Sequence, residues 1–164
     1  MLLNFYWETK IQGLRLAFAM LRQPEAEDCI ANLTRLVADE AKHLWLLSRK
    51  IAELGGTPIP DSRVHRMRRG QMARIPKDWS GQLALAVAAK ERACSRYTKE
   101  FSSEGATLTE PWRTIAEDDK SHLTWLKERL ARFGGKSDWR DRVEDYLSAE
   151  ETVYAAFTAP PPGP

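Results

Sequence analysis

The chain has 164 residues, of which 43% are hydrophobic and 29% are charged, and a formal net charge of +2. This length suits one domain with a substantial core and is short for two ordinary domains. The composition is ordinary for a globular protein, so it argues against intrinsic disorder and against a fibrous architecture. The net charge is too small to indicate a polyanionic partner by itself.

The sequence shows no sign of a membrane span, a secretory signal or a disulfide framework. No apolar run approaches the roughly 18 residues that a spanning helix needs, and the N-terminal segment carries charge early. Cys29 and Cys94 lie far apart and form no CxxC pair, so we interpret them as small core residues. We therefore expect a cytoplasmic protein without a membrane partner.

Four long segments with helical periodicity, separated by strong turn signals, predict an all-α fold. They cover about residues 3–21, 25–54, 80–101 and 109–133, with Ser80 as the expected N-cap of the third. Short connections make two antiparallel hairpins, and the long, proline-containing segment 57–80 makes a crossover between them. We expect a four-helix bundle over residues 1–137, an accessory helix over 138–157 and a disordered tail over 158–164.

An internal repeat relates the second and fourth helical segments. When residues 39–56 are laid over 118–135, seven of the eighteen positions are identical. The identities include Asp39 with Asp118, His43 with His122, and the Gly-Gly pair that ends each segment. Two similar hairpins, arising by duplication or pseudo-symmetry, explain this pattern.

In each of the four predicted bundle helices, acidic residues or histidines lie within or beside the apolar stripe. Glu40 and His43 interrupt the second helix, and Asp119 and His122 interrupt the fourth at the matching place. Glu91 stands in the stripe predicted for the third helix, which consists of Leu83, Val87, Cys94 and Phe101. Glu8 lies beside the stripe predicted for the first helix, which consists of Trp7, Ile11, Leu14, Phe18 and Leu21.

The four carboxylates are expected at one level of the bundle. The midpoint between Glu8 and Glu40 is Pro24, and the midpoint between Glu91 and Asp119 is Gly105, both in hairpin connections. Ionised carboxylates in a core are costly unless they are paired or bind a cation. A carboxylate and a histidine at spacing i, i+3 share one helix face, and their oxygen and nitrogen donors suit iron or manganese.

These residues resemble the ferritin-like di-iron carboxylate proteins, which have one Glu on each of two helices and Glu-x-x-His on each of the other two. The resemblance covers about residues 3–135 and implies a ferritin-like four-helix bundle. It implies a site for two Fe ions, or for Mn or mixed Mn/Fe, with these ligands: Glu8, Glu40, His43, Glu91, Asp119 and His122. The second motif departs from the pattern because it begins with an aspartate, so we expect its metal to be held differently or more weakly.

The resemblance implies a non-haem di-iron oxidoreductase that activates dioxygen or peroxide, takes electrons from an external donor and oxidises or hydroxylates a small-molecule substrate. It points to no catalytic residue beyond the metal ligands. The lack of a CxxC pair argues against a full-length rubrerythrin, and the basic crossover argues against the membrane-bound demethoxyubiquinone hydroxylases. Two alternatives stay open, namely ferroxidase- or peroxidase-type handling of iron or peroxide, and a metal-free helical interaction module. A homodimer also stays open.

The crossover carries seven potentially basic side chains in fifteen residues: Arg63, His65, Arg66, Arg68, Arg69, Arg74 and Lys77. They lack the aromatic interleaving that is typical of single-strand nucleic-acid binding. A solvated loop is the favoured interpretation, and docking of RNA or another anion is the alternative.

Overall fold

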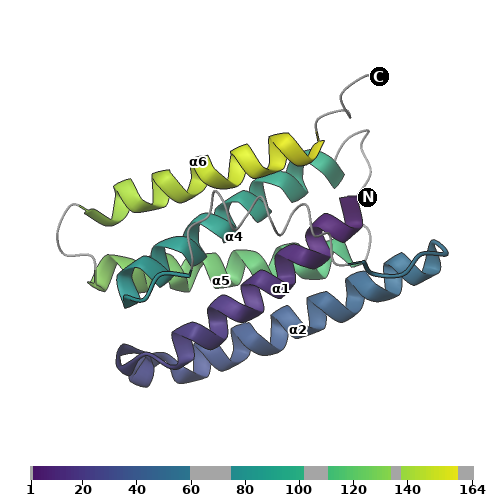
Figure 1. Ribbon diagram of the computed structural model, residues 1–164. Coiled ribbons are helices and arrows are strands. Elements are labelled where there is room, and N and C mark those ends of the chain that lie inside the picture. Colours follow the sequence, from purple (N-terminus) through teal and green to yellow (C-terminus); the bar gives the residue numbers. More distant parts are fainter. Residues whose placement is uncertain (1, 60–74, 102–110, 134–137, 159–164) are drawn as a thin grey trace.

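The computed structural model describes residues 2–59, 75–101, 111–133 and 138–158, and within these ranges the regular structure is entirely helical, as the sequence predicts. In chain order the elements are α1 (Leu2–Leu21), η1 (Pro24–Cys29), α2 (Ile30–Glu53), α4 (Trp79–Phe101), α5 (Trp112–Phe133) and α6 (Asp138–Thr158) (Figure 1). Most of the basic crossover, the connection between α4 and α5, the second Gly-Gly pair and the end of the tail lie outside the described residues.

The start of the second helix differs from the prediction of one continuous helix from Glu25. Residues 24–29 form the 3-10 helix η1, with Pro24 in its first turn. Cys29 then leaves helical geometry at φ −135° and ψ 18°, and α2 begins at Ile30. This break redirects the chain so that α2 runs back along α1.

The predicted Gly-Gly stop of the second helix is confirmed. Gly55 adopts φ 76°, a left-handed conformation that side chains disfavour. Its N–H donates to Ala52 O at 2.9 Å, and the N–H of Gly56 donates to Ile51 O at 3.0 Å. These two bonds satisfy carbonyls at the end of α2 that have no partner within the helix.

The cap of α4 is Asp78 and not Ser80. Asp78 O accepts the first helical hydrogen bond from Gln82 N, at 3.0 Å. The carboxylate of Asp78 also accepts a hydrogen bond from Gly81 N at 2.8 Å, which satisfies an N–H group of the first turn. That bond lowers the pKa of Asp78 more than burial raises it.

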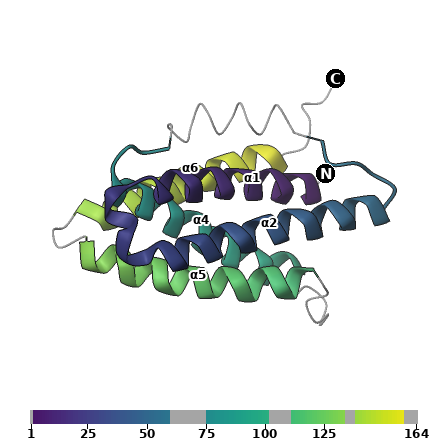
Figure 2. The same cartoon turned by 90° about the horizontal axis from the view of Figure 1, so that it is seen from below.

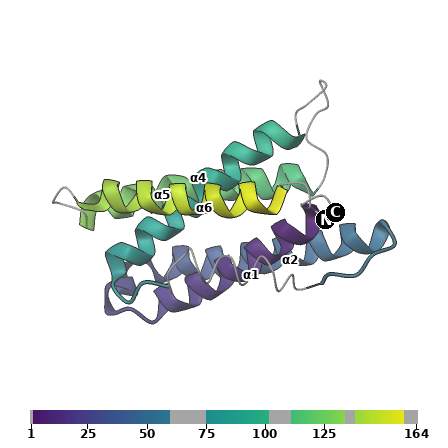
Figure 3. The same cartoon turned by 45° about the horizontal axis from the view of Figure 1, so that its top comes forward.

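The helices pack as two antiparallel hairpins that face each other. α1 packs mainly on α2, and α4 packs on α5, with additional contacts between α1 and α4 and between α2 and α5. The α1–α2 pair lies on one side of the molecule, and α4, α5 and α6 lie on the other (Figure 3). Seen from below the view of Figure 1, α5 lies beside α2 (Figure 2). The candidate site lies where the two hairpins meet.

The two described ends of the connection between α2 and α4 lie at opposite ends of α1. Before the gap in the described residues, Ile59 N donates to the side chain of Asn4, at the start of α1. After the gap, the side chain of Gln23, just beyond α1, donates to Lys77 O at 2.9 Å. The connection therefore starts at one end of α1 and finishes at the other, as the predicted crossover requires.

α6 packs along α4 and is fastened to it through Arg96. The guanidinium of Arg96 donates to the backbone oxygen of Glu150 and lies 4.1 Å from the centre of the Tyr154 ring. The predicted accessory helix is therefore an additional helix on the outer side of α4.

Among the residues that the structure describes, the apolar core forms two clusters. One includes Leu33, Leu83 and Leu126 and gathers residues on one side of the polar positions of each helix. The other includes Tyr6 and Ile115 and gathers residues on the opposite side. A layer of charged side chains separates the two clusters.

The inward face of α1 differs from the predicted stripe. Phe18 is 54% exposed, and the buried apolar residues of α1 are Phe5, Tyr6, Leu16, Ala17 and Met20. α1 carries apolar residues on nearly all sides, so its sequence pattern does not single out one face. Across the described helices, no stretch combines the length with the hydropathy that a membrane span requires.

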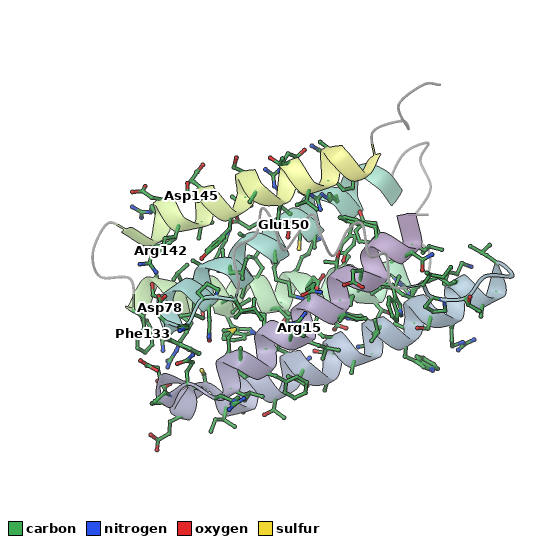
Figure 4. The ribbon with its side chains drawn as sticks, viewed as in Figure 1. Arg15, Asp78, Phe133, Arg142, Asp145 and Glu150 are labelled. Atoms are coloured by element: carbon green, nitrogen blue, oxygen red, sulfur yellow. The ribbon has the colours of Figure 1, made fainter. Side chains whose placement is uncertain are left out.

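We expect Asp78→Ala to lower the free energy of unfolding by about 1 kcal/mol, because it removes the cap of α4. The hydrogen bond from the nearby Arg142, which donates to Asp78 at 2.8 Å, would also be lost (Figure 4). Chemical denaturation measures the change. Asp145→Ala on the exposed side of α6 removes the same charge and serves as the control. An equal effect of the two substitutions would contradict the assignment of the cap.

Candidate functional site

The two predicted helix motifs meet inside the structure. Glu40 and His43 on α2, and Asp119 and His122 on α5, are all buried. Ligand atoms of Glu40, Asp119 and His122 lie within 4.8 Å of one another. His43 Nδ1 lies 3.8 Å from Glu40 Oε1 and 3.9 Å from Asp119 Oδ1. The inward orientation predicted for these four residues is confirmed.

Two lysines, which the sequence interpretation did not include, complete the charged centre. Lys90 Nζ on α4 donates to both Glu40 Oε1 and Asp119 Oδ1. Lys10 Nζ on α1 donates to Asp119 Oδ2 at 2.7 Å and to Glu40 Oε1 at 3.4 Å. The side chains of both carboxylates are almost fully buried. We call these four residues the lysine–carboxylate ring.

Glu8 and Glu91 do not occupy the positions expected for them. Glu91 lies at the edge of the α4–α5 pair, where Lys127 Nζ contacts its carboxylate at 2.6 Å. Glu8 is buried, but its carboxylate accepts a hydrogen bond from Gln12 on the same helix. A helix turns by about 100° per residue, so residues one or two positions from Lys90 and Lys10 project in other directions. The inward places on α1 and α4 at this level belong to Lys10 and Lys90.

Each histidine is held by an aspartate from the facing helix. His43 Nε2 lies 2.9 Å from Asp118 Oδ2, and His122 Nε2 lies 3.0 Å from Asp39 Oδ2. A carboxylate can only accept, so each Nε2 carries the proton and donates it. The two contacts are reciprocal, because each motif supplies one aspartate and one histidine.

The second ring nitrogen of each histidine faces the centre. The Nδ1 atoms of His43 and His122 are buried and have no hydrogen-bond partner. In a neutral imidazole that donates through Nε2, Nδ1 carries the lone pair that binds a metal. A histidine that is oriented by a carboxylate behind it is typical of metal ligands.

The ring holds both carboxyl groups in the ionised form. Burial raises the pKa of Glu40, but the charges of Lys10 and Lys90 outweigh it and lower the pKa from 4.5 to about 2. The same opposing effects hold the pKa of Asp119 well below its ordinary value. Burial lowers the pKa of Lys10, whereas the two carboxylates raise it by more. At neutral pH Glu40 and Asp119 are therefore carboxylates and Lys10 stays charged. Lys90 contacts both carboxylates.

Tyr97 closes one side of the centre. Its hydroxyl donates to Asp119 Oδ2 at 3.2 Å, the same oxygen that Lys10 contacts at 2.7 Å. Burial and the charges of Asp119 and Glu40 hold the pKa of Tyr97 well above its ordinary value. Tyr97 therefore keeps its proton and acts as a donor.

Gly13 on α1 lets Glu40 approach the helix backbone. A Cβ atom at this position would lie 2.7 Å from Glu40 Oε2 and 3.2 Å from Glu40 Cδ. Glu40 is held by two ammonium groups and has little freedom to move away. The absence of a side chain at Gly13 is therefore part of the site.

Two sequence signals could have revealed the residues that were missed. Lys10 follows Tyr6 by four residues and precedes Ala17 by seven, and Lys90 follows Val87 by three and precedes Tyr97 by seven. Both lysines thus continue a buried helical stripe. The identity of Asp39 and Asp118 in the internal repeat was the corresponding signal for the aspartates.

Comparison with family models, with curated proteins and with solved structures finds no match for this chain.

We expect Gly13→Ala to lower the free energy of unfolding by about 1 kcal/mol. The new methyl group displaces the Glu40 carboxylate, at a cost of about 1–3 kcal/mol that outweighs the better helix propensity of alanine. The control is chemical denaturation of two further proteins, the Glu40→Ala variant and the Gly13→Ala/Glu40→Ala double variant. In the Glu40→Ala background the same substitution should stabilise the protein, and an equal effect in both backgrounds would contradict the close contact.

We also expect the ring to set part of the acid stability of the metal-free protein. The folded-state pKa of Glu40 lies below its ordinary value, so its contribution is present above pH 4.5 and is lost as the pH falls to about 2. Glu40→Gln should lower the free energy of unfolding at neutral pH by roughly 3 kcal/mol, because it breaks a buried ion pair. Between pH 4.5 and 2 the variant should lose less stability than the parent. Denaturant unfolding at a series of pH values measures the free energy of unfolding of both proteins. Profiles that run parallel for the parent and Glu40→Gln would refute this role of Glu40.

Proposed function

We propose that this protein is a ferritin-like four-helix bundle with a redox-active metal centre, and that it acts as a non-haem oxidoreductase toward dioxygen or peroxide. The observation that carries the proposal is the orientation of the two imidazoles. His43 and His122 each have an aspartate behind Nε2 and a buried, unpartnered Nδ1 that faces the carboxylates. Two buried ring nitrogens without partners are costly unless a bound ligand supplies the missing interaction.

The donor set favours one metal ion. His43 and His122 would bind through Nδ1, and Glu40 and Asp119 through carboxylate oxygens. Mixed nitrogen and oxygen donors suit iron, with manganese as an alternative. Four donors are enough for one such ion, whereas the expected pair of ions relied on two further carboxylates. We therefore propose one ion in this centre instead of two.

When bound, a redox-active ion would supply electron transfer between an external donor and dioxygen or peroxide. The residues of the chain would supply protons and exclude bulk water. In the metal-free protein, Lys10 Nζ and Tyr97 Oη both hold protons next to Asp119 Oδ2. The apolar clusters on either side keep the centre dry, which strengthens the electrostatic interactions within it. An organic substrate would make the protein an oxidase or hydroxylase, and iron or peroxide as substrate would make it a ferroxidase or peroxidase.

A second candidate function is a metal-free helical interaction module. The observation that favours it is the lysine–carboxylate ring, in which both carboxylates already have cationic partners. In that case the ring would be a structural element, and the protein would act through its surface.

The metal proposal predicts that the metal-free protein binds about one Fe²⁺ per chain under anaerobic conditions. His122→Ala should lower the affinity at least tenfold, because it removes a ligand whose aspartate partner remains in place. Equilibrium titration with metal analysis measures both values. His65→Ala removes the histidine that lies outside the described residues and serves as the control.

Exposure of the iron-loaded protein to dioxygen should then consume oxygen, and His122→Ala should abolish this consumption. A binding stoichiometry near zero would eliminate the oxidoreductase proposal and leave the metal-free module.

A further inference from the structure

Lys90 contacts one oxygen of each of the two carboxylates that are candidate metal ligands. Its Nζ bridges Glu40 Oε1 and Asp119 Oδ1. His43 Nδ1 lies 3.8 and 3.9 Å from the same two oxygens. Two oxygens that could coordinate an ion thus already hold an ammonium group, and a third candidate donor, His43 Nδ1, lies within 4 Å of both oxygens.

Lys10 approaches the same carboxylates through a partly different set of atoms. It contacts Asp119 Oδ2 at 2.7 Å and shares Glu40 Oε1 with Lys90 at 3.4 Å. Each carboxylate therefore has both lysines as partners, one from its own hairpin and one from the other. No carboxylate of the ring is left without a cation.

The ring is electrically neutral, with two carboxylates and two ammonium groups. A divalent ion added to the complete ring would leave two excess positive charges in a buried centre, which is strongly unfavourable. A divalent ion that replaces both ammonium groups leaves the total charge unchanged. Charge balance therefore favours an exchange over an addition.

We infer that Lys10 and Lys90 are built-in counter-cations of the metal-free protein, and that one divalent ion enters the centre by displacing both ammonium groups from Glu40 and Asp119. One doubly charged ion enters and two singly charged groups leave their oxygens, so the charge balances. The displacement step rests on the proposed metal function. The role of the lysines in the metal-free protein is independent of that function.

The structure also indicates the order of displacement. The side chain of Lys90 is 11% exposed and that of Lys10 is 3% exposed, so Lys90 has the shorter route to solvent. Lys10 is the more deeply buried of the two, and its Nζ lies 6.0 Å from the centre of the Tyr97 ring, whose face offers it a position once it too has left the carboxylates. Lys90 is therefore displaced first.

The first test compares Zn²⁺ binding by the metal-free parent, Lys90→Met and Lys127→Met at one pH and ionic strength. Competition with a chromophoric chelator gives the dissociation constants. We expect one Zn²⁺ per chain and at least tenfold tighter binding by Lys90→Met, because the ion no longer competes with that ammonium group. Lys127→Met removes the same charge from the ion pair with Glu91 and should bind within about twofold of the parent. Equal affinities of all three proteins would overturn the inference and leave the metal proposal standing.

A second test needs no substitution in the centre. Buried, hydrogen-bonded lysine ammonium groups exchange their protons slowly enough for detection by ¹⁵N NMR, and we expect two such groups in the metal-free parent. Both signals should move or disappear at one equivalent of Zn²⁺. Signals that persist unchanged while Zn²⁺ is bound would overturn the displacement.

A third protein separates failure of the inference from failure of the proposed function. If the parent binds no Zn²⁺, the Lys10→Met/Lys90→Met double variant should still gain binding, because both built-in cations are gone. That result would support the counter-cation role and reject a metal function for the natural protein. A double variant that folds, by circular dichroism, and still binds no Zn²⁺ would overturn the inference.

Discussion

Four charged side chains at one level of a helical core are tolerated only because each has a partner of opposite charge. α1 and α4 supply the lysines, and α2 and α5 supply the carboxylates. Lys10 lies closer to Asp119 of the facing hairpin than to Glu40 of its own, at 2.7 against 3.4 Å. The reciprocal histidine–aspartate contacts join α2 to α5 at the same level. The ring and these contacts therefore join the two hairpins at the level between the two apolar clusters.

The sequence predicts the helices and the inward faces of α2 and α5 well, because polar residues interrupt otherwise regular apolar stripes there. It fails on α1 and α4 for a geometric reason. The midpoint argument locates the level of a residue along a hairpin, and Lys10 and Lys90 lie within two residues of the predicted level. Each residue step rotates the side chain by about 100°, so a correct level does not establish a direction. Lysine and glutamate are both rarely buried, so residue type alone does not choose between Lys10 and Glu8, or between Lys90 and Glu91.

The aspartates behind the histidines show a second limit. Asp39 and Asp118 lie next to Glu40 and Asp119 in sequence, yet each serves a histidine of the other helix. Their partners depend on how α2 and α5 face each other. The helical periodicity of one segment cannot predict that arrangement. The internal repeat does match Asp39 with Asp118. The role of the two aspartates becomes evident only when α2 and α5 are placed side by side.

The division of the core into two apolar clusters has a consequence for helix register. An apolar core alone tolerates a helix that slides by one turn, about 5.4 Å, since one leucine can replace another in a similar pocket. With the charged layer in place, such a slide of α1 would carry Lys10 away from Glu40 and Asp119 and into an apolar cluster. The penalty for an unpaired buried charge rules that alignment out. The charged layer thus selects one vertical alignment of the four helices among several that hydrophobic packing would accept.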